Sequence, residues 1–535
     1  MPVTPQEPAN PVFKDAASCG KWLAQLQLTN LQQAHGVLLT EINELNRFAM
    51  RAPDRLETLE LLRDTVGHVQ EEYAKKLAAR PLPLRDHELV IFFALVQLWQ
   101  AMALGYRRCL QTRLEGGQPP ARQDALLCQR ALLYTGKTIC QHLHTGYEVD
   151  DRLWRQLHDL YQFAETHGLL LEKISAGPDN TPTTCHDAYL GILLTAYIYP
   201  EEPSRAQLRL LESWLPQWTG MLVTERRHVI SKDDAPPLAF DMNDAQHGLQ
   251  PAHNVANGEN VRYVAMTPLS KLLRVKTILL QQDKTPQQVE LGEIGNSREC
   301  LDLLALLHRR WCEDNDMRSG ARDPARRPAL LYSGHENIYA RLTGKAHQQP
   351  AKPVEDDSVA RKQIETYGRV LQNAPDRKPV SAEPPPEIWH IDNESIRGAQ
   401  LTREHACDTQ LGRHQLVALR GGNERPFVLG DAAWVKIIRT GQLQAGVRYL
   451  PGEVEAVNFQ ITGKSASGKF APAFMLHAVP ALAIPASLVI GRGGFEPGRE
   501  IEVLRQNGEK QKVKLGFIVE RGIDYERVSF RREGA

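Results

Sequence analysis

The sequence predicts an α+β protein of several domains, in which a helical bundle is followed by a small mixed α/β segment and then by antiparallel β-barrels. Two patterns support this fold class. Leucines recur at helical intervals through roughly the first 215 residues, whereas short apolar runs separated by glycine-containing turns dominate after residue 387. A chain of 535 residues also exceeds a single ordinary core. We therefore expect domains at 1–215, 216–316, 317–460 and 461–535.

The composition narrows the class of protein. Lys+Arg and Asp+Glu both total 64, so the formal net charge is zero, which argues against a general nucleic-acid binder. The eight cysteines are scattered without a Cys-x-x-Cys pair, so they predict reduced thiols rather than a disulfide framework or a zinc site. The first residues lack the basic start and apolar core of a signal peptide. These features predict a cytoplasmic protein.

The first 215 residues are expected to form a helical bundle. Leu38, Leu39, Ile42 and Leu45 are typical of its heptad-like spacing. The longest apolar run, 89–106, contains Gln97 and Gln100 and barely reaches the span of a bilayer core, so a helix buried inside the bundle explains it better than membrane insertion.

The middle segment, 216–316, is predicted to mix short strands with two helices. The expected strands are 220–224, 237–241 and 261–264. Thr267-Pro268 is typical of a helix start, and this helix should continue to Leu280. A second helix is expected over 297–313.

Two barrel-like units are predicted after the middle segment, and a proline-rich insertion at 344–388 interrupts the first. That insertion is expected to hold a short helix at 357–371. The expected strands of the first unit are 387–391, 415–419, 433–439, 443–450 and 453–459, with a hairpin turn at Thr440-Gly441. Those of the second unit are 486–491, 499–504, 511–517 and 527–530.

Two short motifs flank β-like sequence in the first barrel-like unit. Asn393-Glu394-Ser395-Ile396-Arg397-Gly398 follows an expected strand and offers an amide, a hydroxyl and a glycine at a turn. About 70 residues upstream, Arg322 and Arg326 lie four positions apart, just before the expected strand 329–332. Arginine is suited to phosphate oxygens and to planar bases, because its guanidinium is flat, always charged and fork-shaped. Taken singly, either motif is also typical of an ordinary solvated loop or turn.

Together the two motifs resemble the Arg-x-x-x-Arg and Asp/Asn-x-Ser-x-x-Gly signature of the PilZ family of bacterial cyclic di-GMP receptors. The runs 434–439 and 444–450 look like later strands of that family's barrel. The resemblance covers residues 318–460. It implies a flexible arginine arm leading into a β-barrel, with the second motif on the barrel face.

The resemblance assigns ligand-binding roles to five residues. Arg322 and Arg326 would clamp phosphates and stack on guanines, Asn393 and Ser395 would bond the nucleotide edges, and Gly398 would permit close approach or a bend. The register of the arm is open, because Arg318 and Arg322 form a second Arg-x-x-x-Arg pair and Arg327 adjoins Arg326; Arg397 is a possible additional cation.

The resulting hypothesis is a receptor that couples cyclic di-GMP binding to a change in domain arrangement or partner binding. No catalysis, cofactor or metal is expected, since no acid–base pair, nucleophile arrangement or metal-ligand spacing is evident. A protein partner is expected through the helical domain. The alternative is a ligand-free interaction scaffold with a degenerate PilZ-like barrel.

Overall fold

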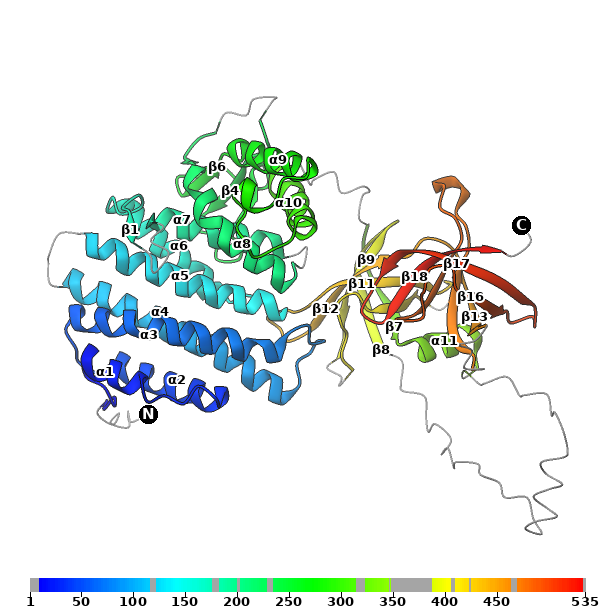
Figure 1. Ribbon diagram of the computed structural model, residues 1–535, viewed down its shortest axis with the longest axis horizontal. Coiled ribbons are helices and arrows are strands. Elements are labelled where there is room, and N and C mark those ends of the chain that lie inside the picture. Colours follow the sequence, from blue (N-terminus) through cyan, green and yellow to red (C-terminus); the bar gives the residue numbers. More distant parts are fainter. Residues whose placement is uncertain are drawn as a thin grey trace, which may run out of the picture. The chain divides into compact units, whose positions relative to one another are not determined.

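A computed structural model describes residues 9–115, 122–175, 182–199, 203–228, 234–313, 323–345, 347, 387–405, 409–422, 425–462 and 469–532. The chain divides into two compact units (Figure 1). The helical unit contains residues 1–80 and 84–319, and the barrel unit contains residues 81–83 and 320–535. Arg318 and Arg322, together with the expected helix at 357–371 and most of the insertion 344–388, lie outside the described residues.

The helical unit confirms the predicted bundle. Its helices are α1 (Ala16–Leu23), α2 (Leu31–Arg47), α3 (Ala52–Ala74), α4 (Asp86–Glu115), α5 (Arg122–Thr145), α6 (Asp151–Thr166), α7 (Cys185–Ile198), α8 (Arg205–Trp218), α9 (Thr267–Gln281) and α10 (Ser297–Cys312). Side chains of Asp15, Thr184 and Asn296 accept hydrogen bonds from the first turns of α1, α7 and α10 in capping boxes, which fixes where these helices begin. In Figure 1, α3, α4 and α5 run side by side.

Helix α4 contains the long apolar run and packs against α2, α3 and α5. Phe92, Leu95, Leu98, Met102 and Tyr106 are buried at helical spacing and face these neighbours. By length and composition, one helix among the described residues, α4, could cross a membrane. However, 56% of the residues in its most apolar stretch are buried inside the protein.

The middle segment does not form a core of its own. Its strands β3 (Thr224–Glu225), β6 (Val261–Val264), β4 (Leu238–Asp241) and β5 (Gln250–Pro251) form a four-stranded sheet in that order. Phe240 of β4 packs edge-on against Tyr161 and Tyr189 of the bundle, with ring centroids 5.5 and 5.1 Å apart. Residues 216–316, expected as a separate domain, therefore share one hydrophobic core with the helices before them. The strand expected at 220–224 is largely a 3-10 turn, Thr219–Met221, followed by the short β3.

The barrel unit contains two closed antiparallel barrels of six strands, which confirms the two predicted barrel-like units. The first has the strand order β10-β11-β12-β9-β8-β7, and the second has the order β13-β14-β15-β18-β17-β16. The strands of the first are β7 (Asp323–Ser333), β8 (Glu387–Ser395), β9 (Gly398–Arg403), β10 (Leu416–Gly421), β11 (Val428–Ile437) and β12 (Leu443–Tyr449). Those of the second are β13 (Val454–Ile461), β14 (Ala471–Leu476), β15 (Ser487–Gly491), β16 (Glu500–Leu504), β17 (Lys510–Arg521) and β18 (Tyr525–Arg532).

Three details of the barrel unit differ from the sequence-based expectation. Strand β13 pairs with β14 and β16, so the second barrel begins before the expected boundary at residue 461. Strand β14 is a further strand that the sequence did not predict; its Pro472, opposite Asn458, lacks a backbone donor and is untypical of a central strand. Helix α11 (His335–Thr343), which follows β7, was also not predicted.

The two barrels share apolar contacts. Leu416, Leu429 and Leu450 of the first belong to the same buried cluster as Phe474 and Tyr525 of the second. The second barrel also has an interior cluster of its own. The two barrels therefore pack together into one body.

Candidate functional site

The second predicted motif forms the β8–β9 hairpin of the first barrel. Ser395 pairs with Gly398 across a two-residue turn made of Ile396 and Arg397. The Arg397 backbone N–H donates to Ser395 Oγ at 3.4 Å, and Ser395 Oγ donates to the Gly398 carbonyl at 3.2 Å. The serine therefore closes the turn, as hydroxyl side chains commonly do.

Asn393 lies on the outer face of the hairpin. It is paired with Gln400 of β9, and its Nδ2 donates to Gln400 Oε1 at 3.2 Å. The flanking residues Ala399 and Leu401 are buried, so the alternation along β9 points Gln400 away from the barrel interior. The amide of Asn393 thus belongs to a half-buried polar pair on the barrel surface.

A steric constraint explains why position 398 is occupied by glycine. A Cβ atom at this position would lie 2.2 Å from the Val447 carbonyl oxygen and 3.2 Å from the Arg448 Cα atom. The glycine therefore allows β9 to approach the backbone of β12. From the sequence we expect a close approach to the chain at Gly398. The group that lies close to it is the backbone of the neighbouring strand β12.

The described part of the arginine arm lies on β7, beside β8. An irregularity in the β7–β8 pairing falls between Pro324, opposite Asn393, and Arg327, opposite Ile391, so Arg326 is next to the Asn393 motif. Arg326 is exposed, whereas Arg327 is half-buried and forms an ion pair with Glu394. Of the two adjacent arginines, Arg326 is the one that faces solvent.

Glu394 is held from three sides. Besides Arg327, it contacts Arg425 at 3.4 Å and accepts a hydrogen bond from the Tyr449 hydroxyl at 2.7 Å. Burial raises the pKa of Tyr449 to about 12, so its hydroxyl stays protonated and donates. Arg327 consequently stabilises the barrel wall and is less suited than Arg326 to reach a ligand.

A shallow depression lies beside the hairpin. This barrel groove has a volume of about 180 Å³ and is lined by Ser395, Arg397, Gly398 and Gln400 on one side and by Trp434, Gly446 and Arg448 on the other. A Cβ atom at Gly446 would lie 2.1 Å from Trp434 Nε1, so the absence of a side chain there lets the indole lie flat on β12. The groove therefore combines an aromatic face, amide and hydroxyl groups, and two guanidinium groups.

The structure brings together part of the predicted site. Arg326, Asn393, Ser395 and Gly398 lie on the neighbouring strands β7, β8 and β9. Of these four, Ser395 and Gly398 line the barrel groove, as does Arg397, the additional cation. Sequence reasoning did not assign Trp434, Gln400 or Arg448 to the site, because strand pairing in the closed barrel decides which residues line the groove.

Arg448 connects the barrel groove to the second barrel. Its guanidinium lies 3.3 Å from Asp431 Oδ2 and forms an ion pair with Glu520 of β17. Burial disfavours ionisation of Asp431, but hydrogen bonds from His414 and Arg448 outweigh it and lower its pKa. The side chain of Arg448 is 52% exposed, which leaves it free to contact a bound molecule as well.

Within the described ranges, no group of three or more His, Cys, Asp or Glu side chains is arranged to hold a metal ion. The chemistry at the barrel groove is therefore that of cations, amides and one aromatic face. Such a surface suits a planar anionic molecule.

The chain resembles known proteins in both of its units. Residues 17–227 match a family model described as the N-terminal domain of the cyclic-di-GMP receptor FimW, and residues 457–533 match one described as the FimW C-terminal beta-barrel domain. The chain is also 22% identical over 545 residues to the cyclic-di-GMP receptor FimW of Pseudomonas aeruginosa, covering 92% of this chain and 86% of that protein. The barrel groove lies between the two matched stretches, and the PilZ resemblance stays a prediction from the motifs.

Proposed function

We propose that this chain, whose matches support a family of cyclic-di-GMP receptors, itself binds cyclic di-GMP on the outer face of its first barrel. The main structural support is the barrel groove, which places two arginines, a tryptophan and the Ser395–Gly398 hairpin around one depression. The indole of Trp434 offers a stacking surface for guanine, and Arg397 and Arg448 offer donors to phosphate and to the guanine edge.

The ligand would extend beyond the groove. A volume of about 180 Å³ is below the roughly 300 Å³ at which pockets begin to enclose a drug-sized molecule, so the groove holds one base or one phosphate. The rest of the dinucleotide would lie across β9 and β8 toward Asn393 and Arg326. In this PilZ-like mode Arg322 joins Arg326 as the clamp on the opposite side, and no catalytic step or cofactor is required.

The first test is isothermal titration of the full chain with cyclic di-GMP. We expect saturable binding that weakens at least about fivefold in Trp434→Ala, since stacking on an aromatic side chain contributes about 1–3 kcal/mol per base. A similar loss is expected for the double variant Arg322→Ala/Arg326→Ala. Arg531→Ala, an exposed arginine of β18 far along the sequence from the motifs, is the matched control and should bind normally.

No detectable heat with the unmutated protein would remove the receptor hypothesis. One observation favours the alternative, a ligand-free scaffold: Asn393, Ser395 and Gly398 each have a structural role that needs no ligand. In that case both the tryptophan and the arginine variants would retain partner binding unchanged.

Coupling to the second barrel is proposed to pass through Arg448. Glu520 holds this guanidinium from the second barrel, and Glu520 also accepts a hydrogen bond from the Tyr525 hydroxyl at 3.2 Å. A phosphate in the groove would compete with Glu520 for Arg448. Such competition gives the ligand different affinities for two arrangements of the junction, which is the condition for a ligand-driven change.

Replacing Glu520 with glutamine should therefore tighten cyclic di-GMP binding. The phosphate would no longer compete with a carboxylate, and because Arg448 is half-exposed we expect a gain of only about threefold, corresponding to roughly 0.6 kcal/mol. Glu502→Gln, which removes the partner of Lys510 at 3.1 Å elsewhere on the same barrel, is the control and should leave affinity unchanged. Weaker binding by Glu520→Gln would contradict this route.

The helical unit is proposed to bind a protein partner. It is the larger of the two units, and its described helices expose several large apolar side chains, among them Val90 and Phe93 of α4. A receptor that only binds its ligand needs a second surface through which it acts on another protein. The barrel groove is proposed to bind the nucleotide and to catalyse nothing.

A further inference from the structure

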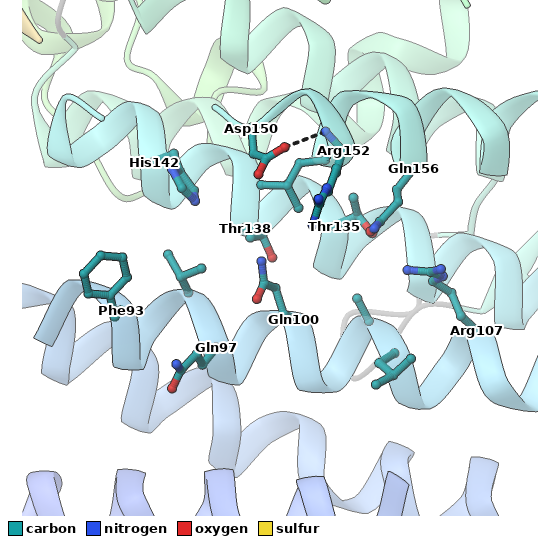
Figure 2. A pocket seen from close by; sticks show the side chains of 14 residues that line it. Phe93, Gln97, Gln100, Arg107, Thr135, Thr138, His142, Asp150, Arg152 and Gln156 are labelled. Atoms are coloured by element: carbon teal, nitrogen blue, oxygen red, sulfur yellow. Dashed lines mark hydrogen bonds between the residues drawn. The ribbon is translucent and has the colours of Figure 1, made fainter. Parts of the chain in front are cut away.

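A second concave surface lies in the helical unit, far along the sequence from the barrel groove. This α4–α6 groove has a volume of about 510 Å³ and runs between α4 on one side and α5 and the start of α6 on the other. Phe93 and Arg107, both on α4, mark its two ends, as Figure 2 shows. At a rise of 1.5 Å per residue these positions are about 21 Å apart along the helix.

The groove changes in character along its length. At one end are the Phe93 ring, which is 52% exposed, and His142 of α5. Arg107 of α4 lies at the other end, and Arg152 and Gln156 of α6 lie between the middle of the groove and that end (Figure 2). The surface is thus aromatic at one end and cationic at the other.

Both arginines are available for an external partner. Among the described residues, neither guanidinium has an ion pair or a side-chain hydrogen bond; the contact drawn at Arg152 in Figure 2 is its backbone N–H donating to Asp150 Oδ1 at 2.8 Å. That bond caps the N-terminus of α6. The Asp150 carboxylate also lines the groove, so the two arginines exceed the negative charge by one, which favours an anionic partner.

The middle of the groove is lined by amides and hydroxyls. Gln100 projects from α4 toward α5, where Thr138 lies opposite it in Figure 2, and Gln97 also lines the groove. Thr135, only 1% exposed, lines the groove with a hydroxyl that has no hydrogen-bond partner within the described part of the chain, and the same is true of His142 Nδ1.

We infer that the α4–α6 groove binds an extended peptide segment of a partner protein, with an apolar side chain near Phe93 and an acidic group at Arg107 and Arg152. Three features select this occupant. A length of about 21 Å accommodates roughly six residues of extended chain. Glutamine side chains both donate and accept, which matches the alternating donors and acceptors of a peptide backbone. The two arginines favour a carboxylate as the anionic group of the peptide.

This inference rests on the proposed partner-binding role of the helical unit, but it does not depend on cyclic di-GMP binding in the barrel unit. The two can be tested on the same protein samples. A preparation that binds peptide and ignores the dinucleotide would remove the receptor proposal alone, and the reverse result would remove the groove proposal alone.

The test uses the full chain and an array of six-residue peptides that carry phenylalanine near one end and glutamate near the other. A second array replaces glutamate with lysine. We expect binding to members of the glutamate array, confirmed with labelled peptides by fluorescence anisotropy. Affinity should fall at least tenfold in Arg107→Ala/Arg152→Ala and should also fall in Phe93→Ala.

The control variant is Arg155→Ala, which removes an exposed arginine of the same helix α6 that does not line the groove. It should bind the selected peptides as the unmutated protein does. Cyclic di-GMP titration should be unchanged in every variant of this groove. Equal binding of the lysine array, no binding by either array, or full binding by Arg107→Ala/Arg152→Ala would each overturn the inference.

Discussion

Replacing Gly398 with alanine should destabilise the first barrel by about 3 kcal/mol, a large effect for the addition of one methyl group. The new Cβ atom would lie 2.2 Å from the Val447 carbonyl oxygen, and this neighbour is backbone that cannot rotate away. Strands β9 and β12 would have to separate, with loss of hydrogen bonds along their shared ladder. The measurement is urea-induced unfolding of the full chain followed by circular dichroism.

The matched control for this change is Gly491→Ala in β15 of the second barrel. A Cβ atom there meets nothing within 4 Å, so its effect should stay within about 0.5 kcal/mol. Equal stability of the two variants would contradict the packing of β9 against β12. It would also favour the other role of Gly398, which the PilZ resemblance implies, as a point where the nucleotide approaches the chain closely.

Replacing Asp431 with alanine should weaken the junction between the two barrels by a similar amount. Its carboxylate is 1% exposed and accepts hydrogen bonds from the Tyr525 hydroxyl at 3.3 Å and from Arg448 Nη2 at 3.3 Å, with His414 Nδ1 at 3.1 Å. Removing a buried acceptor leaves these donors incompletely paired, at a cost of about 3 kcal/mol. Thermal or urea unfolding of the variant measures the loss.

The difference in stability between the unmutated protein and Asp431→Ala should depend on pH. Because the folded-state pKa of Asp431 is lowered, the folded chain holds its proton less strongly than the unfolded chain does. The stabilisation is therefore complete above the unfolded value of about 3.9 and is lost as the pH falls through the folded value. The stability difference between the unmutated protein and Asp431→Ala should therefore shrink as the pH falls below about 4.

Asp392→Ala is the control, because this half-buried carboxylate lies on the outer face of β8 and accepts from Thr402 Oγ1 at 2.7 Å and from Gln444 Nε2 at 3.3 Å. It should cost no more than about 1 kcal/mol. If Asp392→Ala and Asp431→Ala were equally destabilising, the buried junction would have no special importance. The coupling route through Arg448 would then lose its structural basis.

Much of the architecture follows from local patterns in the chain. The alternation in 443–450 and the Thr440-Gly441 turn predict β12 and the preceding hairpin, and Gly441 has a φ of +80° as such a turn requires. The helix expected over 297–313 is present as α10, and its Asn296 cap fixes the start. These features depend on residues a few positions apart, so the sequence is enough to predict them.

The candidate site was predicted only in part for the same reason. The hairpin motif and the exposed Arg326 could be recognised as short patterns, whereas Arg327 looked equivalent until its ion pair with Glu394, more than 60 positions away, was visible. The involvement of Trp434 depends on which strand pairs with β11. That choice is made by the closure of the whole barrel.

The sequence by itself predicted most of the helices and strands, the hairpin turn at Thr440-Gly441, and the two motifs that resemble the PilZ signature. Only the tertiary structure decided that residues 216–316 complete the helical core, that β13 belongs to the second barrel, and that Arg448 meets Glu520 across the junction. The physical reason is one of range. Helical and strand periodicities and turn residues act within a few positions, but strand pairing and burial are decided by the contacts of the whole folded chain.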